Sequence, residues 1–325
     1  MVGEKLKIVL TRRWPRAVEE RMGDFGEVVI NDDDRPMSQA ELRAALESAD
    51  IVCPTVTDRL PADVLLGPVK TRLLANFGVG FNHIDLDSAA ASGIQVTNTP
   101  GVLTDATAEI ALTLMMMSAR RAGEGERLVR SGAWDGWRPT HMLSTQVSGK
   151  TLGIIGMGRI GMAFARQARH GLGMRIVCYN RSKVLESVLS ELQAEQVELD
   201  DLLSMADFVS LHCPATPATR HLIDASALAR MHRHAILINT ARGDVVDEIA
   251  LVEALRDGRI AGAGLDVYEA EPALSPGLSE LENVVLLPHM GSGTEETRIA
   301  MGMRALANVA AFIAGETLPD LVREI

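Results

Sequence analysis

The chain has few cysteines, no excess of positive charge and no long hydrophobic run. Cys53, Cys178 and Cys213 are widely spaced and form no C-x-x-C pair, so we expect reduced thiols of a cytoplasmic protein, without a disulfide framework or a metal site. The net charge of −11 disfavours a nucleic acid or an anionic membrane surface as partner. The longest apolar run, residues 110–117, is too short to cross a bilayer. No basic segment followed by an apolar one opens the chain, so we expect no leader peptide.

Strands and helices are predicted to alternate along the 325 residues, a length that favours two domains. Apolar, β-branched segments predict two series of strands, at 6–10, 27–30, 50–53, 73–77 and 94–97, and at 151–155, 175–179, 208–211, 235–239, 262–266 and 284–287. Predicted helices include 162–173, 295–314 and 104–121, and the last is apolar almost all round, so we expect it to be buried. This rhythm is typical of an α/β protein with two doubly wound parallel sheets.

Gly156, Gly158 and Gly161 form a G-x-G-x-x-G pattern between a predicted strand and a predicted helix. In that context the first glycine permits a tight turn, the second lets the backbone approach a pyrophosphate, and the third lets the helix pack closely on the strand. The N-terminus of the helix then offers unpaired N–H groups to the phosphates. The pattern predicts a dinucleotide-binding site.

The segment that closes the next strand bears on the choice of dinucleotide. NAD-binding proteins place an acidic residue there to bind the adenosine ribose, but this chain has Asn180, followed by Arg181, Ser182 and Lys183. Two cations and a hydroxyl would bind a 2′-phosphate that a carboxylate would repel. The sequence therefore favours NADP(H), with NAD(H) as the alternative.

Three polar residues follow predicted strands of the second series. Arg242, Glu271 and His289 each lie just beyond a strand, and ligands of open α/β sheets bind outside the carboxyl ends of the strands. An arginine that holds a carboxylate and a Glu–His pair that moves a proton are what the reduction of a 2-keto acid requires. Taken singly, each residue could instead be a surface ion pair, a solvated carboxylate or a core histidine.

Together with further stretches, these residues resemble the D-isomer-specific 2-hydroxyacid dehydrogenase family over essentially the whole chain. The stretches are NFGVGFNHID at 76–85, NTPG at 98–101, TAE at 107–109, HCP at 212–214, NTARG at 239–243, LDVY at 265–268 and PHMGS at 288–292. Met290 and Gly293 are mild departures from the residues common in the family.

The resemblance implies a role for each site residue. Arg242 would bind the substrate carboxylate and polarise the keto oxygen, His289 would be the general acid and base, and Glu271 would pair with His289. Val79 and Gly80 would give backbone N–H groups to the carboxylate. The dinucleotide would contact the glycine loop and the residues Val79, Thr107, Arg159, Ile160, Asn180, Arg181, Ser182, Cys213, Thr240, Ala241, Arg242, Asp266, His289 and Gly291.

The resemblance also implies a domain plan. A Rossmann nucleotide domain, residues 102–293, would be inserted into a flavodoxin-like substrate domain made of residues 1–101 and 294–325. Two copies would form a homodimer through their nucleotide domains.

The turn at 180–183 and the loop with Trp134 and Trp137 are most similar to glyoxylate/hydroxypyruvate reductases, which reduce small 2-keto acids. In those relatives a tryptophan of this loop reaches the neighbouring subunit, so Trp137 is either such a residue or an ordinary interface or core tryptophan. Formate dehydrogenases resemble a pattern with Gln in place of Glu271, and phosphoglycerate dehydrogenases usually carry an acidic residue at position 180. Two alternatives stay open: a phenylpyruvate- or D-lactate-type dehydrogenase of the same family, and a nucleotide-sensing, corepressor-like scaffold.

Overall fold

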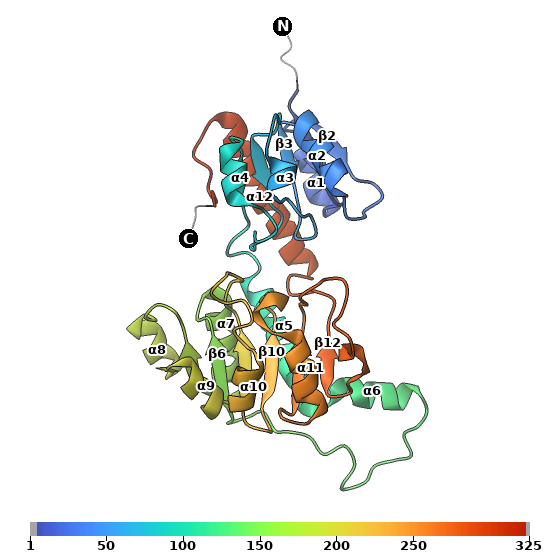
Figure 1. Ribbon diagram of the computed structural model, residues 1–325, viewed down its shortest axis with the longest axis vertical. Helices are drawn as coiled ribbons and strands as arrows, with labels where there is room; N and C mark the ends of the chain where they lie inside the picture. Colours follow the sequence, from blue (N-terminus) through green and yellow to red (C-terminus); the bar gives the residue numbers. More distant parts are fainter. Residues whose placement is uncertain (1–4, 323–325) are drawn as a thin grey trace. The chain divides into compact units, whose positions relative to one another are not determined.

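The computed structural model describes residues 5–322 and divides the chain into two compact units. The first comprises the residues up to Leu103 together with those from Ser292 onward, and the second is Thr104–Gly291. Each is built around one all-parallel sheet (Figure 1), so the predicted α/β class with two parallel sheets is confirmed.

The first unit has a five-stranded sheet in the order β2-β1-β3-β4-β5. Helices α1 and α12 contribute to the core on one face of this sheet, and α2, α3 and α4 to the core on the other. Ser38 and Glu41 form the capping box that opens α2. The elements are β1 (Lys7–Leu10), α1 (Arg16–Met22), β2 (Glu27–Ile30), α2 (Gln39–Ser48), β3 (Ile51–Cys53), α3 (Ala62–Leu65), β4 (Leu73–Ala75), α4 (Leu86–Ala91), β5 (Gln95–Thr97) and α12 (Glu295–Ala314).

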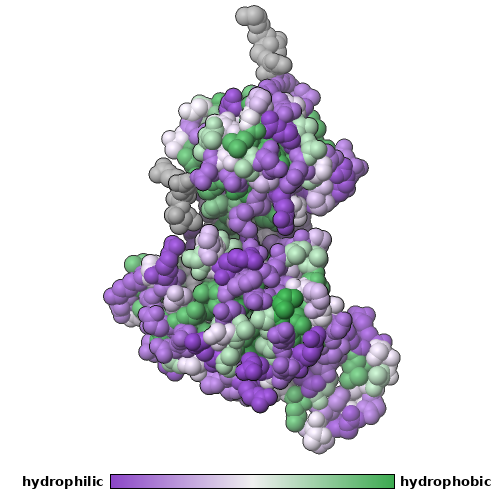
Figure 2. All heavy atoms as spheres, in the orientation of Figure 1, coloured by the Kyte–Doolittle hydropathy of each residue, from purple (hydrophilic) through white to green (hydrophobic). Residues whose placement is uncertain are grey.

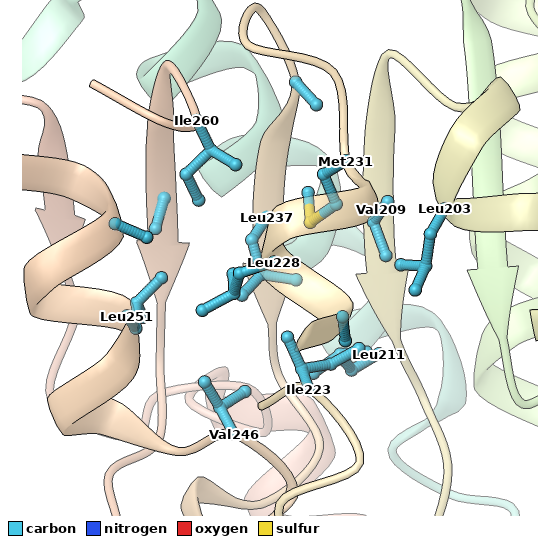
Figure 3. Close-up of a cluster of buried hydrophobic side chains, with 14 of the residues drawn as sticks. Leu203, Val209, Leu211, Ile223, Leu228, Met231, Leu237, Val246, Leu251 and Ile260 are labelled. Carbon is cyan, nitrogen blue, oxygen red and sulfur yellow. The ribbon is translucent and has the colours of Figure 1, made fainter. Parts of the chain in front are cut away.

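The second unit has a seven-stranded sheet in the order β12-β11-β10-β9-β6-β7-β8. Helices α9, α10 and α11 pack on one face, where Leu203, Leu228 and Leu251 meet the strand residues Val209 and Leu237 (Figure 3); α5, α7 and α8 pack on the other. The elements are α5 (Thr104–Arg120), α6 (Ala122–Arg130), β6 (Thr151–Ile155), α7 (Arg159–Leu172), β7 (Arg175–Tyr179), α8 (Glu186–Leu192), β8 (Glu195–Gln196), α9 (Leu199–Met205), β9 (Phe208–Leu211), α10 (Ala225–Arg230), β10 (Ile236–Asn239), the 3-10 turn η1 (Gly243–Val245), α11 (Glu248–Arg256), β11 (Gly262–Leu265), η2 (Leu278–Glu280) and β12 (Val284–Leu286).

Three features differ from the sequence expectations. The short edge strand β8 was not among the predicted strands. Helix α5 is buried along one face only, because Ile110, Leu112, Met116 and Met117 stay half-exposed. Beyond α5 the chain forms an arm, residues 121–146, whose helix α6 contributes no buried side chain and projects from the rest of the unit (Figure 1). Helix α6 was not among the helices expected from the sequence.

Within residues 5–322, no helix is both long and apolar enough to cross a membrane. The same part of the chain contains no group of three or more histidine, cysteine or acidic side chains that could hold a metal ion. All three cysteines are free thiols.

Candidate active site

The glycine loop connects β6 to α7, and its glycines meet different requirements. Gly156 has a φ of +98°, and a Cβ there would lie 2.6 Å from the backbone nitrogen of Cys213. A Cβ at Gly161 would lie 2.3 Å from the carbonyl oxygen of Gly156, whereas a Cβ at Gly158 would meet nothing within 4 Å. The first and third glycines are therefore required by the fold, and the second leaves open space beside the N-terminus of α7.

Asn180, directly after β7, braces this loop. Its Oδ1 accepts a hydrogen bond from the backbone N–H of Met157 (3.2 Å), and its Nδ2 donates to the backbone oxygen of Ser182 (3.0 Å). Arg181 and Lys183 are exposed, and within residues 5–322 neither forms an ion pair. Two cations beside a neutral turn suit an anionic group.

The residues around the loop fit a dinucleotide. No side chain caps the N-terminus of the 14-residue helix α7, so the first backbone N–H groups, those of Arg159 and Ile160 among them, remain donors for a phosphate. Thr240, just after β10, is buried, and among residues 5–322 its hydroxyl has no hydrogen-bond partner. A buried hydroxyl without a partner is costly, and a bound ligand would satisfy it.

Arg242 is presented by a turn that Asn239 organises at the end of β10. The side-chain oxygen of Asn239 accepts from the backbone N–H of Ala241 (3.0 Å), and its Nδ2 donates to the backbone oxygen of Arg242 (2.9 Å). The Arg242 Nη1 donates to the backbone oxygen of Ala241 (2.7 Å). Burial lowers the pKa of Arg242, and the negative charges of Glu271 and Asp244 oppose that shift. The result is a half-buried guanidinium close to Glu271.

Glu271 and His289 form a hydrogen-bonded pair. His289 Nδ1 lies 2.8 Å from Glu271 Oε2, and Glu271 Oε1 accepts from the backbone N–H of Tyr268 (3.0 Å). Burial would raise the pKa of Glu271, but the hydrogen bond and charge of His289, with the charge of Arg242, hold that pKa below its ordinary value. An ionised carboxylate can only accept, so the proton between them belongs to Nδ1. The other ring nitrogen, Nε2, is left to exchange a proton with a ligand.

The backbone of His289 is in the left-handed region, with a φ of +52°, which is uncommon for a residue with a side chain. Asp266 secures the segment that follows: its two oxygens accept from the backbone N–H groups of Met290 (2.8 Å) and Gly291 (2.7 Å). The Thr107 hydroxyl at the start of α5 donates to the backbone oxygen of Gly291 (3.0 Å). Burial raises the pKa of Asp266. Two residues predicted as cofactor contacts, Asp266 and Thr107, therefore also fix the loop that carries His289.

Tyr268 joins the loops that carry Glu271 and His289, and the sequence analysis gave it no role. Its hydroxyl donates to the backbone oxygen of Leu287 (2.8 Å), two residues before His289. A residue that acts by linking two loops gives no local signal in the sequence, because its partner lies 19 positions away.

Val79 and Gly80 belong to the first unit, in the loop after β4. Asn98 Nδ2 donates to the backbone oxygen of Val79 (2.8 Å), and Asn76 Nδ2 donates to that of Gly80 (3.0 Å). Within residues 5–322 neither the Val79 nor the Gly80 N–H has an acceptor. Asparagine side chains thus hold the carbonyl groups and leave two adjacent amides as donors. Asn76 and Asn98 are further positioning residues for which the sequence analysis gave no role.

Comparisons with known proteins point to one family. The family model described as "D-isomer specific 2-hydroxyacid dehydrogenase, NAD binding domain" matches residues 112–291. A protein named glyoxylate reductase from Thermococcus litoralis is 43% identical over 98% of this chain and 97% of its own length, and one from Korarchaeum cryptofilum is 45% identical over 98% and 96%.

Solved structures are also similar. A NADPH-dependent glyoxylate/hydroxypyruvate reductase from Sinorhizobium meliloti, solved with NADP and malonate, is 32% identical with a TM-score of 0.87, covering 99% of this chain and 100% of that one. A structure from Polaromonas, described as a D-isomer specific 2-hydroxyacid dehydrogenase, is 36% identical with a TM-score of 0.91, covering 98% and 100%.

Proposed function

Because the chain belongs to the D-isomer-specific 2-hydroxyacid dehydrogenase family, we propose that it reduces a small 2-keto acid, of the glyoxylate or hydroxypyruvate type, to the D-2-hydroxy acid. The observation that carries the proposal is the Glu271–His289 hydrogen bond with the charge of Arg242 close by. The names of the glyoxylate reductases at 43% and 45% identity support this substrate class.

Each residue has a role in the proposed reaction. The nicotinamide dinucleotide supplies the hydride when it is bound. Arg242 binds the substrate carboxylate and stabilises the negative charge that develops on the keto oxygen. His289 Nε2 donates the proton to that oxygen, and Glu271 stabilises the protonated imidazole by accepting from Nδ1. The amides of Val79 and Gly80 are proposed as further donors to the carboxylate.

We propose NADP(H) as the preferred cofactor and the second unit as the domain that binds it. The glycine loop, the N-terminus of α7 and the Thr240 hydroxyl would hold the dinucleotide, and Arg181 and Lys183 would bind its 2′-phosphate. The relative from Sinorhizobium meliloti that was solved with NADP supports this preference. The first unit, with Val79 and Gly80, would be the substrate domain, and the three free thiols suit the cytoplasmic location that we propose.

We further propose that the arm forms a dimer interface through the nucleotide-binding units. It exposes four large apolar side chains, Val129, Trp134, Trp137 and Leu143, and Figure 2 shows separate apolar spots among hydrophilic surface on this projecting part of the molecule. Trp137 is 81% exposed, so within one copy it is not a core residue. Exposed apolar clusters of this kind mark interfaces. A Trp134→Ser, Val129→Asp variant is expected to elute as a monomer, with a light-scattering mass half that of the wild type.

A spectrophotometric assay tests the proposed reaction. We expect oxidation of NADPH at 340 nm with glyoxylate or hydroxypyruvate, a higher KM with NADH, and loss of about 10²–10⁴-fold in turnover on His289→Gln. The exposed His232→Gln is the matched control and should leave turnover unchanged. Activity confined to phenylpyruvate or pyruvate would move the substrate to the other branch of the family. Inactivity across a 2-keto acid panel would support the scaffold alternative.

A further inference from the structure

The segment that carries Glu271 has almost no core contact of its own. It follows β11 and runs from Glu269 to Ser275, and residues 270–274 are all exposed. An exposed segment keeps a defined position only if hydrogen bonds fix it, because packing does not. The position of Glu271 therefore depends on how the ends of the segment are anchored.

Both ends are anchored by one buried side chain, Glu248, in the first turn of α11. Its Oε1 accepts from the backbone N–H of Glu269 (2.9 Å), and its Oε2 accepts from the Ser275 hydroxyl (2.6 Å). These partners stand two residues before and four residues after Glu271. One carboxylate thus clamps the segment on both sides of the residue that pairs with His289.

The charge of Glu248 has no role in an ion pair. Glu248 is 2% exposed, and within residues 5–322 it forms no salt bridge. A buried carboxylate is costly unless its oxygens are bound, and the N-terminus of α11 offsets part of that cost. The charged groups nearby face other partners: Glu269 faces His221 (2.6 Å) and Arg220 (3.8 Å), and Glu271 faces His289. The interactions of the Glu248 carboxylate are therefore its two hydrogen bonds to Glu269 and Ser275, which clamp the segment.

We propose that Glu248 is a positioning residue for the reaction, which keeps the Glu271 carboxylate within hydrogen-bonding distance of His289 Nδ1. The inference rests on the proposed function of the Glu271–His289 pair. Loss of the clamp lets the segment move, and a displacement of about 1 Å at a proton-transfer group costs on the order of 10²-fold in rate. It also weakens the stabilisation of the protonated imidazole.

The test compares Glu248→Ala and Glu248→Gln with Glu253→Ala, an exposed position on the same helix. We expect Glu248→Ala to lower kcat by about 10- to 100-fold with KM for the keto acid within about twofold. Glu248→Gln should be intermediate, because its amide oxygen can still accept one of the two hydrogen bonds. Glu253→Ala should match the wild type.

A folded Glu248→Ala enzyme with wild-type kcat would overturn the inference. Should that variant fail to fold, Ser275→Ala, which removes one of the two anchors, replaces it with the same expected direction. A second readout does not need activity: hydrogen exchange of the backbone N–H groups in residues 269–275 should become faster in the variant than in the wild type, and unchanged exchange would also overturn the inference. If the proposed function is wrong, the wild-type protein itself will be inactive on every keto acid, which distinguishes that outcome from failure of the Glu248 inference.

Discussion

Replacement of Glu271 by glutamine tests the proposed chemistry at its centre. Two donors converge on this carboxylate, His289 Nδ1 at 2.8 Å and the backbone N–H of Tyr268 at 3.0 Å. Glutamine offers one acceptor oxygen, so one donor must face the amide NH₂ group. A hydrogen bond to a charged group contributes about 1.5–3 kcal/mol, and each 1.4 kcal/mol is tenfold in rate. We therefore expect kcat/KM for the keto acid to fall by about 10- to 150-fold.

The pH dependence gives the loss a signature. The pKa of Glu271 lies below its ordinary value, because the His289 interactions and the Arg242 charge outweigh the effect of burial. The carboxylate is therefore ionised across the neutral range, where glutamine at this position carries no charge. The loss should accordingly be present at every pH from 5 to 9, and it should become smaller only in more acidic solution, where the wild-type carboxylate is itself protonated.

The assay follows NADPH oxidation at 340 nm from pH 5 to pH 9, with melting temperatures to verify folding. Glu280→Gln, an exposed glutamate in the same unit, is the control for the isosteric change and should match the wild type. A folded Glu271→Gln enzyme with kcat/KM within twofold of wild type at neutral pH would refute the role given to the pair.

Three further outcomes follow from the geometry. Gly161→Ala places a Cβ 2.3 Å from the Gly156 oxygen, so we expect overpacking to lower the free energy of unfolding by about 1–3 kcal/mol and to weaken dinucleotide binding in calorimetry. Gly171→Ala on the same helix is the control: its Cβ meets nothing within 4 Å, and dinucleotide binding should be unchanged. Arg181→Ala should raise KM for NADPH about tenfold or more and leave that for NADH unchanged; equal effects on both would contradict the 2′-phosphate contact. Burial lowers the pKa of His212 to about 3. Below about pH 6.5 the unfolded chain therefore binds a proton at His212 that the folded protein does not, and the free energy of unfolding decreases by up to about 1.4 kcal/mol for each unit by which the pH is lowered. His212→Gln should flatten that slope in urea unfolding between pH 6.5 and pH 4, and an unchanged slope would show that His212 is not its source.

The sequence can predict those parts of the site that are formed by residues close together in the chain. The glycine loop is one strand, one turn and one helix, and its glycine spacing is a local pattern. The contact that requires Gly161 lies within the loop, whereas the contact that requires Gly156 comes from Cys213. The carboxyl ends of parallel strands share one edge of a sheet, so residues that follow β10, β11 and β12 come together. Arg242, Glu271 and His289 could be proposed as a group for that reason alone.

Asn180 has one role that the sequence indicates and another that it does not. The residue type alone indicates that no acidic side chain follows β7 to bind the adenosine ribose. Its hydrogen bond to the Met157 N–H spans 23 positions, so the bracing of the glycine loop appears only when β6 and β7 are paired. The half-exposed side of α5 has a similar cause, because the apolar content of a helix does not reveal how many of its faces are covered.

The sequence predicted the two parallel sheets, the dinucleotide loop and three polar residues that each follow a strand, because strand and helix patterning and glycine spacing are properties of nearby residues. Only the tertiary structure decided how those residues are held. The clamp by Glu248 and the link through Tyr268 join positions about 20 residues apart or more, and a buried carboxylate or a phenol in a sequence does not name its partner. The residue types indicate the chemistry that is proposed for the site. Contacts that form only when the chain folds set the distances between those residues.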